Sequence, residues 1–191
     1  MANVNGPFGL RPRRHLTGAS IVMNTYTIAS GYNANIGVGD VVEMTGTGKN
    51  IARAADGNVD NIGVFGGCKY KNAQGEIIYS PFWPANTVAS EVVAYVYDDP
   101  NIVFEAQFDT LAENDIGALC EANWSTDAVN VKTGQSGTQL LGTGSTGTSD
   151  KALRILGIVP APYNEAGAYA RGEVLFIEHV LRGVVAGVGG I

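Results

Sequence analysis

The sequence is short of charged residues. Lysine, arginine, aspartate and glutamate make up 16% of the chain, against about 25% in an average soluble domain. The formal net charge is −6, whereas nucleic-acid-binding domains usually present a basic face, so we expect no nucleic-acid partner. Few charges and 26 glycines favour a surface that other protein covers. A β-rich monomer with many turns is the alternative.

Cysteine is scarce and long apolar runs are missing. Cys68 and Cys120 are the only cysteines, and no C-x-x-C pair is present, so a structural zinc site has no support. We expect two buried free thiols, with a disulfide as the alternative. The C-terminal VLRGVVAGVGGI is too short to span a bilayer, and the first residues lack the apolar stretch of a secretory signal. We therefore predict no membrane partner.

Long amphipathic helices are also missing, and the period of two that marks strands is present instead. Residues 102–109, IVFEAQFD, alternate apolar and mostly polar side chains, which predicts a strand with one wet face. Residues 92–97, VVAYVY, form an unbroken apolar run, which predicts a strand covered on both faces. Between them, DDPN has turn chemistry, so the two strands should form a hairpin with solvated Asp98 and Asp99.

Further short strand candidates are bounded by Gly, Asn, Asp and Ser clusters. They are SIVMNTYTI, DVVEM, IGVFGGCKY, EIIYS, AVNVK, ALRILGIV and EVLFIEHVL. Only TLAENDIGALCEAN suggests one or two helical turns. This pattern predicts an all-β, mainly antiparallel fold, a barrel or a sandwich-like module with little helix. One domain over residues 20–191 is expected, with TGQSGTQLLGTGSTGTSDK as a loop that sets off a possible C-terminal strand group from about residue 150.

The first 19 residues show neither the period of two that marks a strand nor the period of 3.6 that marks a helix, and they carry three of the twelve lysines and arginines. Pro7 and Pro12 keep such a segment extended, and arginines can bind carboxylates with two parallel hydrogen bonds. Residues 1–19 are therefore expected to form an extended N-terminal arm that binds a partner and is dispensable for folding of the domain. A frayed terminus is the alternative.

No motif supports catalysis or a cofactor. Gly142, Gly144 and Gly147 match G-x-G-x-x-G, but a strand-like segment follows where the motif needs a helix. TGTGKN fails the phosphate-loop spacing. The two histidines, His15 and His179, lie far apart in sequence and no G-x-S-x-G is present, which favours a packed or interfacial histidine. We expect no enzymatic activity, no cofactor and no metal, although a hydrolase with dispersed catalytic residues remains an alternative.

Aromatic residues gather in YSPFWPA, at Tyr79, Phe82 and Trp83. This cluster suits a subunit interface, where aromatics are enriched, or a carbohydrate or peptide platform. Two further segments, VVAYVY and the C-terminal apolar tail, also suggest surface that one subunit cannot hide. The oligomer-interface candidates are Phe82, Trp83, Val92, Tyr95, Tyr97, Val184 and Val185.

The order of several segments resembles one family. They are MANVNGPFGLRPRRHLTG, SGYNANIGVGDVVEMTGTG, IGVFGGCKY, YSPFWPA, AYVYDDP, FEAQFD and LRILGIVPAPYNEAGAYARGEVLFIEHVL. Together they cover nearly the whole chain and resemble the capsid cement, or decoration, proteins of tailed bacteriophages. The match is one of overall order, because none of these segments is a catalytic signature.

The resemblance implies a structural protein that binds the outside of an assembled capsid and bridges its subunits. Expected partners are the major capsid protein and further copies of this chain, as a homotrimer at local three-fold axes. The expected location is the outer surface of the virion, assembled in the bacterial host cytoplasm. The capsid-contact candidates are Pro7, Phe8, Arg11, Pro12, Arg13, Arg14 and His15. A carbohydrate- or receptor-binding β-module on a virion surface is the alternative function.

Overall fold

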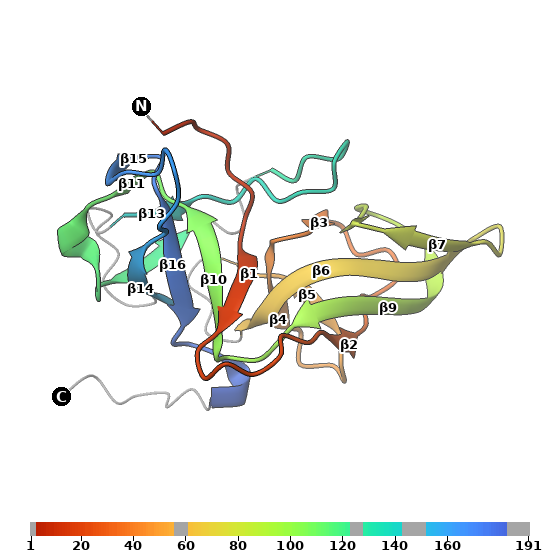
Figure 1. Cartoon of the computed structure of the whole chain (residues 1–191). Coiled ribbons are helices and arrows are strands. Elements are labelled where there is room, and N and C mark those ends of the chain that lie inside the picture. The colour runs from red at the N-terminus through yellow and green to blue at the C-terminus, as the bar shows by residue number, and fades with distance from the viewer. Residues whose placement is uncertain (1–2, 56–60, 123–127, 143–151, 183–191) are drawn as a thin grey trace.

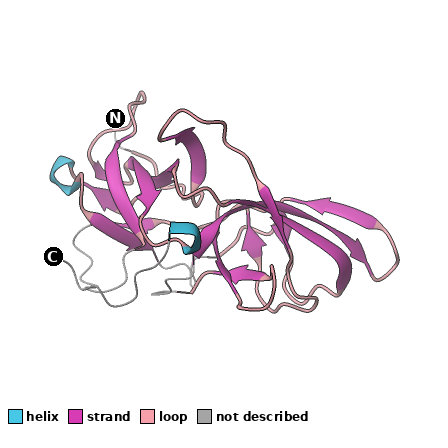
Figure 2. Ribbon diagram, turned by 90° about the horizontal axis from the view of Figure 1, so that it is seen from below, coloured by secondary structure: helices cyan, strands magenta, loops and turns pink. Residues whose placement is uncertain are grey.

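Two six-stranded sheets form the bulk of the molecule. The computed structural model describes residues 3–55, 61–122, 128–142 and 152–182. The two sheets lie side by side, and a long ribbon of β6, β7 and β9 projects from one of them (Figure 1). Figure 2 shows the same two groups of strands from below.

The first sheet has the strand order β1-β10-β16-β14-β12-β13. Its strands are β1 (Arg11–His15), β10 (Ile102–Gln107), β16 (Arg171–Phe176), β14 (Leu153–Ile158), β12 (Leu119–Ala122) and β13 (Leu140–Leu141). All of its strand pairs are antiparallel. Because β14 and β16 are in this sheet with β10, the expected separate strand group from about residue 150 is not formed.

The second sheet has the order β2-β9-β6-β4-β5, with β7 paired to β6. Its strands are β2 (Asn24–Tyr26), β9 (Ala89–Tyr97), β6 (Asn61–Asn72), β4 (Val41–Met44), β5 (Ile51–Arg53) and β7 (Ile77–Ser80). Two-stranded pairs join β3 (Ile36–Gly37) to β8 (Phe82–Trp83), and β11 (Thr110–Leu111) to β15 (Gly167–Ala168). Among the described residues, the helical elements are two 3₁₀ turns, η1 (Glu113–Asp115) and η2 (Val180–Arg182).

The predicted all-β, mainly antiparallel fold with little helix is confirmed. No sheet closes on itself within the described residues, so the arrangement is sandwich-like. One apolar core lies on the first sheet, where the rings of Phe104 and Phe176 meet edge to face at 5.6 Å. A second core lies on the second sheet, where Tyr70 meets Trp83 edge to face at 5.2 Å.

The burial of strands β9 and β10 is the reverse of what the sequence predicted. β10, expected to have one wet face, is buried at all six positions, and even Glu105 is only 7% exposed. Its polar face is covered because Gln107 donates a hydrogen bond to the Val4 carbonyl and accepts one from the Gly6 amide. β9, expected to be covered on both faces, buries Ala94 and Val96 but leaves the alternate positions half-exposed.

The predicted hairpin between β9 and β10 was wrong. A turn does follow β9, with the Ile102 amide bonded to the Asp99 carbonyl at 3.1 Å, but the two strands belong to different sheets. The connection therefore passes from one sheet to the other, and Asp98 is only 4% exposed rather than solvated. Its carboxylate accepts hydrogen bonds from Asn24 Nδ2 at 2.9 Å and from the Tyr26 hydroxyl at 2.7 Å.

The arm is extended as predicted, but the expectation that it lies outside the domain was wrong for residues 9–15. β1 is an edge strand of the first sheet, paired with β10, and the Leu10 side chain is 2% exposed within the first core. Gly9 crosses Gly39 so closely that a Cβ on Gly9 would lie 2.4 Å from the Gly39 carbonyl oxygen. Both glycines have positive φ, +71° and +94°, a conformation that other residues rarely adopt.

Candidate functional site

Two of the three arm arginines are neutralised within the chain. Arg13 contacts Glu105 at 3.1 Å and Glu173 at 2.9 Å, and Arg14 contacts Glu173 at 2.7 Å. From the neighbouring strand, Arg171 contacts the second oxygen of Glu105 at 3.0 Å. These charge-assisted bonds fasten β1 to β10 and β16. Arg13 and Arg14 were predicted to bind carboxylates of a partner. Within the chain, however, they bind the carboxylates of Glu105 and Glu173.

His15 closes the end of β1 and is 9% exposed. Its Nδ1 accepts a hydrogen bond from the Thr17 amide at 3.2 Å, so the proton sits on Nε2, which donates to Asp99 Oδ2 at 3.0 Å. The hydrogen bond from the Asn101 amide is the main cause that lowers the pKa of Asp99 below its ordinary value; burial opposes it, and the His15 bond adds to the lowering. The pair thus ties the arm to the connection between the two sheets.

The remaining arm candidates meet the second sheet at a small cavity. Phe8, Arg11 and Pro12 line a cavity of about 200 Å³ together with Tyr97 of β9. We call these four residues the junction surface. The Arg11 guanidinium carbon lies 4.4 Å from the centre of the Phe8 ring, and Arg11 forms no ion pair with a carboxylate among the described residues. Pro7 lies just before it and is half-buried.

The junction surface continues into the outer face of the second sheet. Residues opposite one another in an antiparallel pair share a face, which places Tyr79, Lys69 and Val93 together across β7, β6 and β9. Tyr95 and Tyr97 lie on this side because they alternate with the buried Ala94 and Val96. Tyr79 is 72% exposed, and Ile77 beside it on β7 is 57% exposed.

The other interface candidates are not on this face. Trp83 is fully buried in the second core, so its assignment to an interface or a carbohydrate platform was wrong. Val92 packs against the same core, and Phe82 is half-buried. Val184 and Val185 lie outside the described residues. The YSPFWPA cluster is therefore split, because strand alternation and the turn at Pro81 send Tyr79 outward and Trp83 inward.

The groups weighed for catalysis or metal binding are packed as structural groups. His179 is 1% exposed and meets the Phe176 ring at 5.8 Å, and burial lowers its pKa to about 4. Cys68 and Cys120 are buried in different cores and are not joined by a disulfide, and burial raises the pKa of Cys68 to about 12.

Motif candidates also lack a site around them. Within the part of the chain that the structure describes, no three His, Cys, Asp or Glu side chains gather as a metal site requires. TGTGKN is the turn between β4 and β5, while Gly144 and Gly147 lie outside the described residues. None of the described helical segments has the length and hydropathy needed to cross a bilayer.

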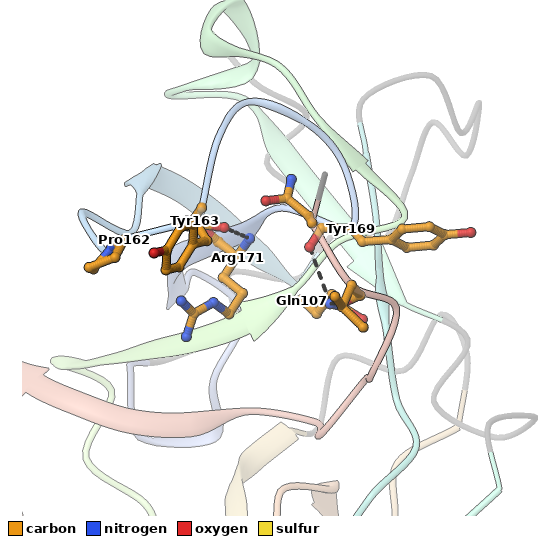
Figure 3. Close-up of a pocket in the computed structure, with 8 residues that line it drawn as sticks. Gln107, Pro162, Tyr163, Tyr169 and Arg171 are labelled. Atoms are coloured by element: carbon orange, nitrogen blue, oxygen red, sulfur yellow. Dashed lines mark hydrogen bonds between the residues drawn. The ribbon is translucent and has the colours of Figure 1, made fainter. Parts of the chain in front are cut away.

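Sequence reasoning missed a larger cleft beside the start of the chain. Its volume is about 490 Å³, and it is lined by Asn3, Val4, Gln107, Pro162, Tyr163, Asn164, Tyr169 and Arg171. The cleft lies between the first described residues and the loop from β14 to β16 (Figure 3). YNEAGAY carries no period or spacing that marks a site, and only the fold brings Asn3 against Glu165 and Ala168.

Comparison of the chain with family models, with curated proteins and with solved structures finds no match. Function must therefore be argued from the junction surface, the outer face and the cleft.

Proposed function

We propose that the chain is a structural virion protein that binds the outside of an assembled phage capsid and bridges neighbouring copies of the major capsid protein. The observation that carries this proposal is the junction surface. Three residues that the sequence offers as capsid contacts, Phe8, Arg11 and Pro12, share one cavity with Tyr97, which the sequence offers as an interface residue. Residues predicted to contact the capsid and a residue predicted to lie in an interface are thus neighbours around one cavity.

The chemistry of the junction surface suits a protein partner. Arg11 is exposed and lies over an aromatic ring, and arginine and aromatic side chains are enriched at the energetically important centres of interfaces. Its guanidinium can bind a carboxylate of a capsid subunit. Arg13 and Arg14 support this role indirectly, because their bonds to Glu105 and Glu173 hold the strand on which Arg11 lies.

The test is binding of the purified protein to undecorated capsids of the phage that encodes it. We expect Arg11→Glu to weaken binding by at least about tenfold, since one charge-assisted bond contributes roughly 1.5–3 kcal/mol. Lys49→Glu is the matched control, because Lys49 is exposed in the turn between β4 and β5 and does not line the cavity of the junction surface. It should bind as the unchanged protein does.

The stabilising role has its own measurement. Capsids saturated with the unchanged protein should release DNA at a higher temperature than bare capsids, and those treated with Arg11→Glu should not. Failure of the unchanged protein to bind would reject the proposal. Binding without a change in the release temperature would reject the stabilising role.

A further inference from the structure

The cleft beside the N-terminal segment contains two strained tyrosines. Tyr163 and Tyr169 have φ of +61° and +59°, a left-handed conformation that costs free energy for a residue with a bulky side chain. Among the described residues, only Asn86 and Glu91 are other non-glycine residues with positive φ. Backbone strain of this kind concentrates at ligand clamps, where the surrounding structure holds it in place.

Side-chain amides hold the loop that carries the two tyrosines. Asn164 donates to the carbonyls of Val159 and Arg171 at 2.8 and 2.9 Å, and accepts from the Arg171 amide at 2.8 Å. Gln107 donates to the Tyr169 carbonyl at 3.1 Å. The backbone that carries the tyrosines is thus held in place before any ligand arrives, which reduces the entropy lost on binding.

The polar atoms of these amides are occupied, so the groups open to a ligand are the aromatic ones. Tyr163 is 68% exposed and Tyr169 is 36% exposed. Their rings project in opposite directions, with the Arg171 side chain beside Tyr163 (Figure 3). Arg171 is paired with Glu105 at 3.0 Å, a carboxylate that it shares with Arg13, so part of its guanidinium is already engaged within the chain.

From this geometry we infer that the cleft binds a neutral oligosaccharide. Tyrosine offers an apolar ring face to the C–H face of a sugar and a hydroxyl to its oxygens. Because the two rings diverge, one sugar unit cannot contact both, and a chain of several units is required. Because Glu105 already engages Arg171, the two tyrosine rings rather than an ion pair are expected to supply the main contacts with the ligand. Parallel aromatic ridges of the kind that bind proline-rich peptides are not formed by Tyr163 and Tyr169.

The experiment is calorimetric titration of the full chain with maltohexaose, cellohexaose, laminarihexaose and chitohexaose. We expect at least one hexasaccharide to bind, and its monosaccharide to bind at least tenfold more weakly. A decaproline peptide is titrated in parallel. Binding of none of the four saccharides, or of the peptide alone, would overturn the inference.

Tyr163→Gly separates a binding role from a structural one. Glycine removes the ring and also relieves the left-handed backbone, so we expect at least a tenfold loss of saccharide affinity with no decrease in the melting temperature. Tyr79→Ala is the control, because Tyr79 is similarly exposed but lies on β7. The affinity of this variant for the saccharide should be unchanged. Saccharide affinity that survives Tyr163→Gly would place binding elsewhere and refute the site.

Discussion

At the scale of single residues, the ionisation of the buried His179 is coupled to folding. Burial is the largest cause of its lowered pKa, about 4 against an ordinary 6.5, and it outweighs the opposing effect of Asp98. The imidazole is therefore neutral in the folded protein at pH 7. Its Nδ1 accepts the Leu181 amide at 3.1 Å, which needs that neutral form.

This lowered pKa makes stability depend on pH in a defined window. Between pH 6.5 and about 4 the unfolded chain binds a proton at His179 that the folded chain does not bind, so stability falls as the pH falls. From pH 7 to 4.5 the loss from this residue is about 2–3 kcal/mol. We expect His179→Gln to lose that much less stability than the unchanged protein over the same range, in urea unfolding at the two pH values. Equal losses would contradict the assignment.

At the scale of elements, β1 decides whether the N-terminal segment is an arm or part of the domain. Leu10 anchors it in the first core, the Gly9–Gly39 crossing sets its path, and Glu105 binds it through Arg13. Pro12 has no amide hydrogen to offer a further strand, and a bulge follows it, so this sheet edge is protected from pairing with another chain.

Shortening the anchor should destabilise the whole domain. We expect Leu10→Ala to lower the free energy of unfolding by about 2–5 kcal/mol, because a buried leucine leaves a cavity behind. Val4→Ala is the control, since Val4 is 81% exposed, and it should change stability by less than about 0.5 kcal/mol. Chemical denaturation measures both. Deletion of residues 1–14 should likewise destabilise the domain, contrary to the expectation from the sequence.

The ion pairs of Glu105 should contribute more than those at the surface. Glu105→Gln removes the charge that Arg13 and Arg171 share, and we expect a loss of roughly 1–3 kcal/mol. Glu91→Gln breaks the exposed pair with Lys71 and should cost less than about 0.5 kcal/mol. The same denaturation measurement applies, and equal effects of the two substitutions would show that β1 is not held by charge.

At the scale of the whole molecule, the outer face of the second sheet presents exposed apolar side chains that a second copy of the chain could cover. Tyr79 and Ile77 are exposed there, and Tyr95 lies half-exposed on the same side. Aromatic residues of this kind dominate the centres of oligomer interfaces. The proposed trimer would place this surface between subunits.

Light scattering after size-exclusion chromatography tests the trimer. The expected mass is about three times the 19.9 kDa of one chain. Tyr95→Glu puts a charge into the proposed contact and should shift the protein toward monomer, whereas Val131→Glu, at an exposed loop position, should not. A monomer for the unchanged protein at all concentrations, on and off the capsid, would exclude this assembly.

Local sequence patterns located many elements. DVVEM, EIIYS and ALRILGIV contain β4, β7 and β14, IGVFGGCKY lies within β6, and TLAENDIGALCEAN contains η1. AVNVK was predicted to be a strand, but it forms only an isolated β-bridge at Asn130. Neither the junction surface nor the cleft could be predicted, because both join the first dozen residues to strands or loops far along the chain.

The sequence by itself determined the all-β class, the scarcity of helix and the position of most turns, because side-chain alternation and turn chemistry act between near neighbours. Only the tertiary structure decided which faces are dry. The alternation of side chains predicted that Glu105 and Gln107 lie on a solvent-exposed face, yet residues 4–13 cover both of them. Trp83 read as a surface aromatic, yet the second core surrounds it. Whether a side chain is buried depends on which distant segment of the chain packs against it, and a local sequence pattern carries no information about that.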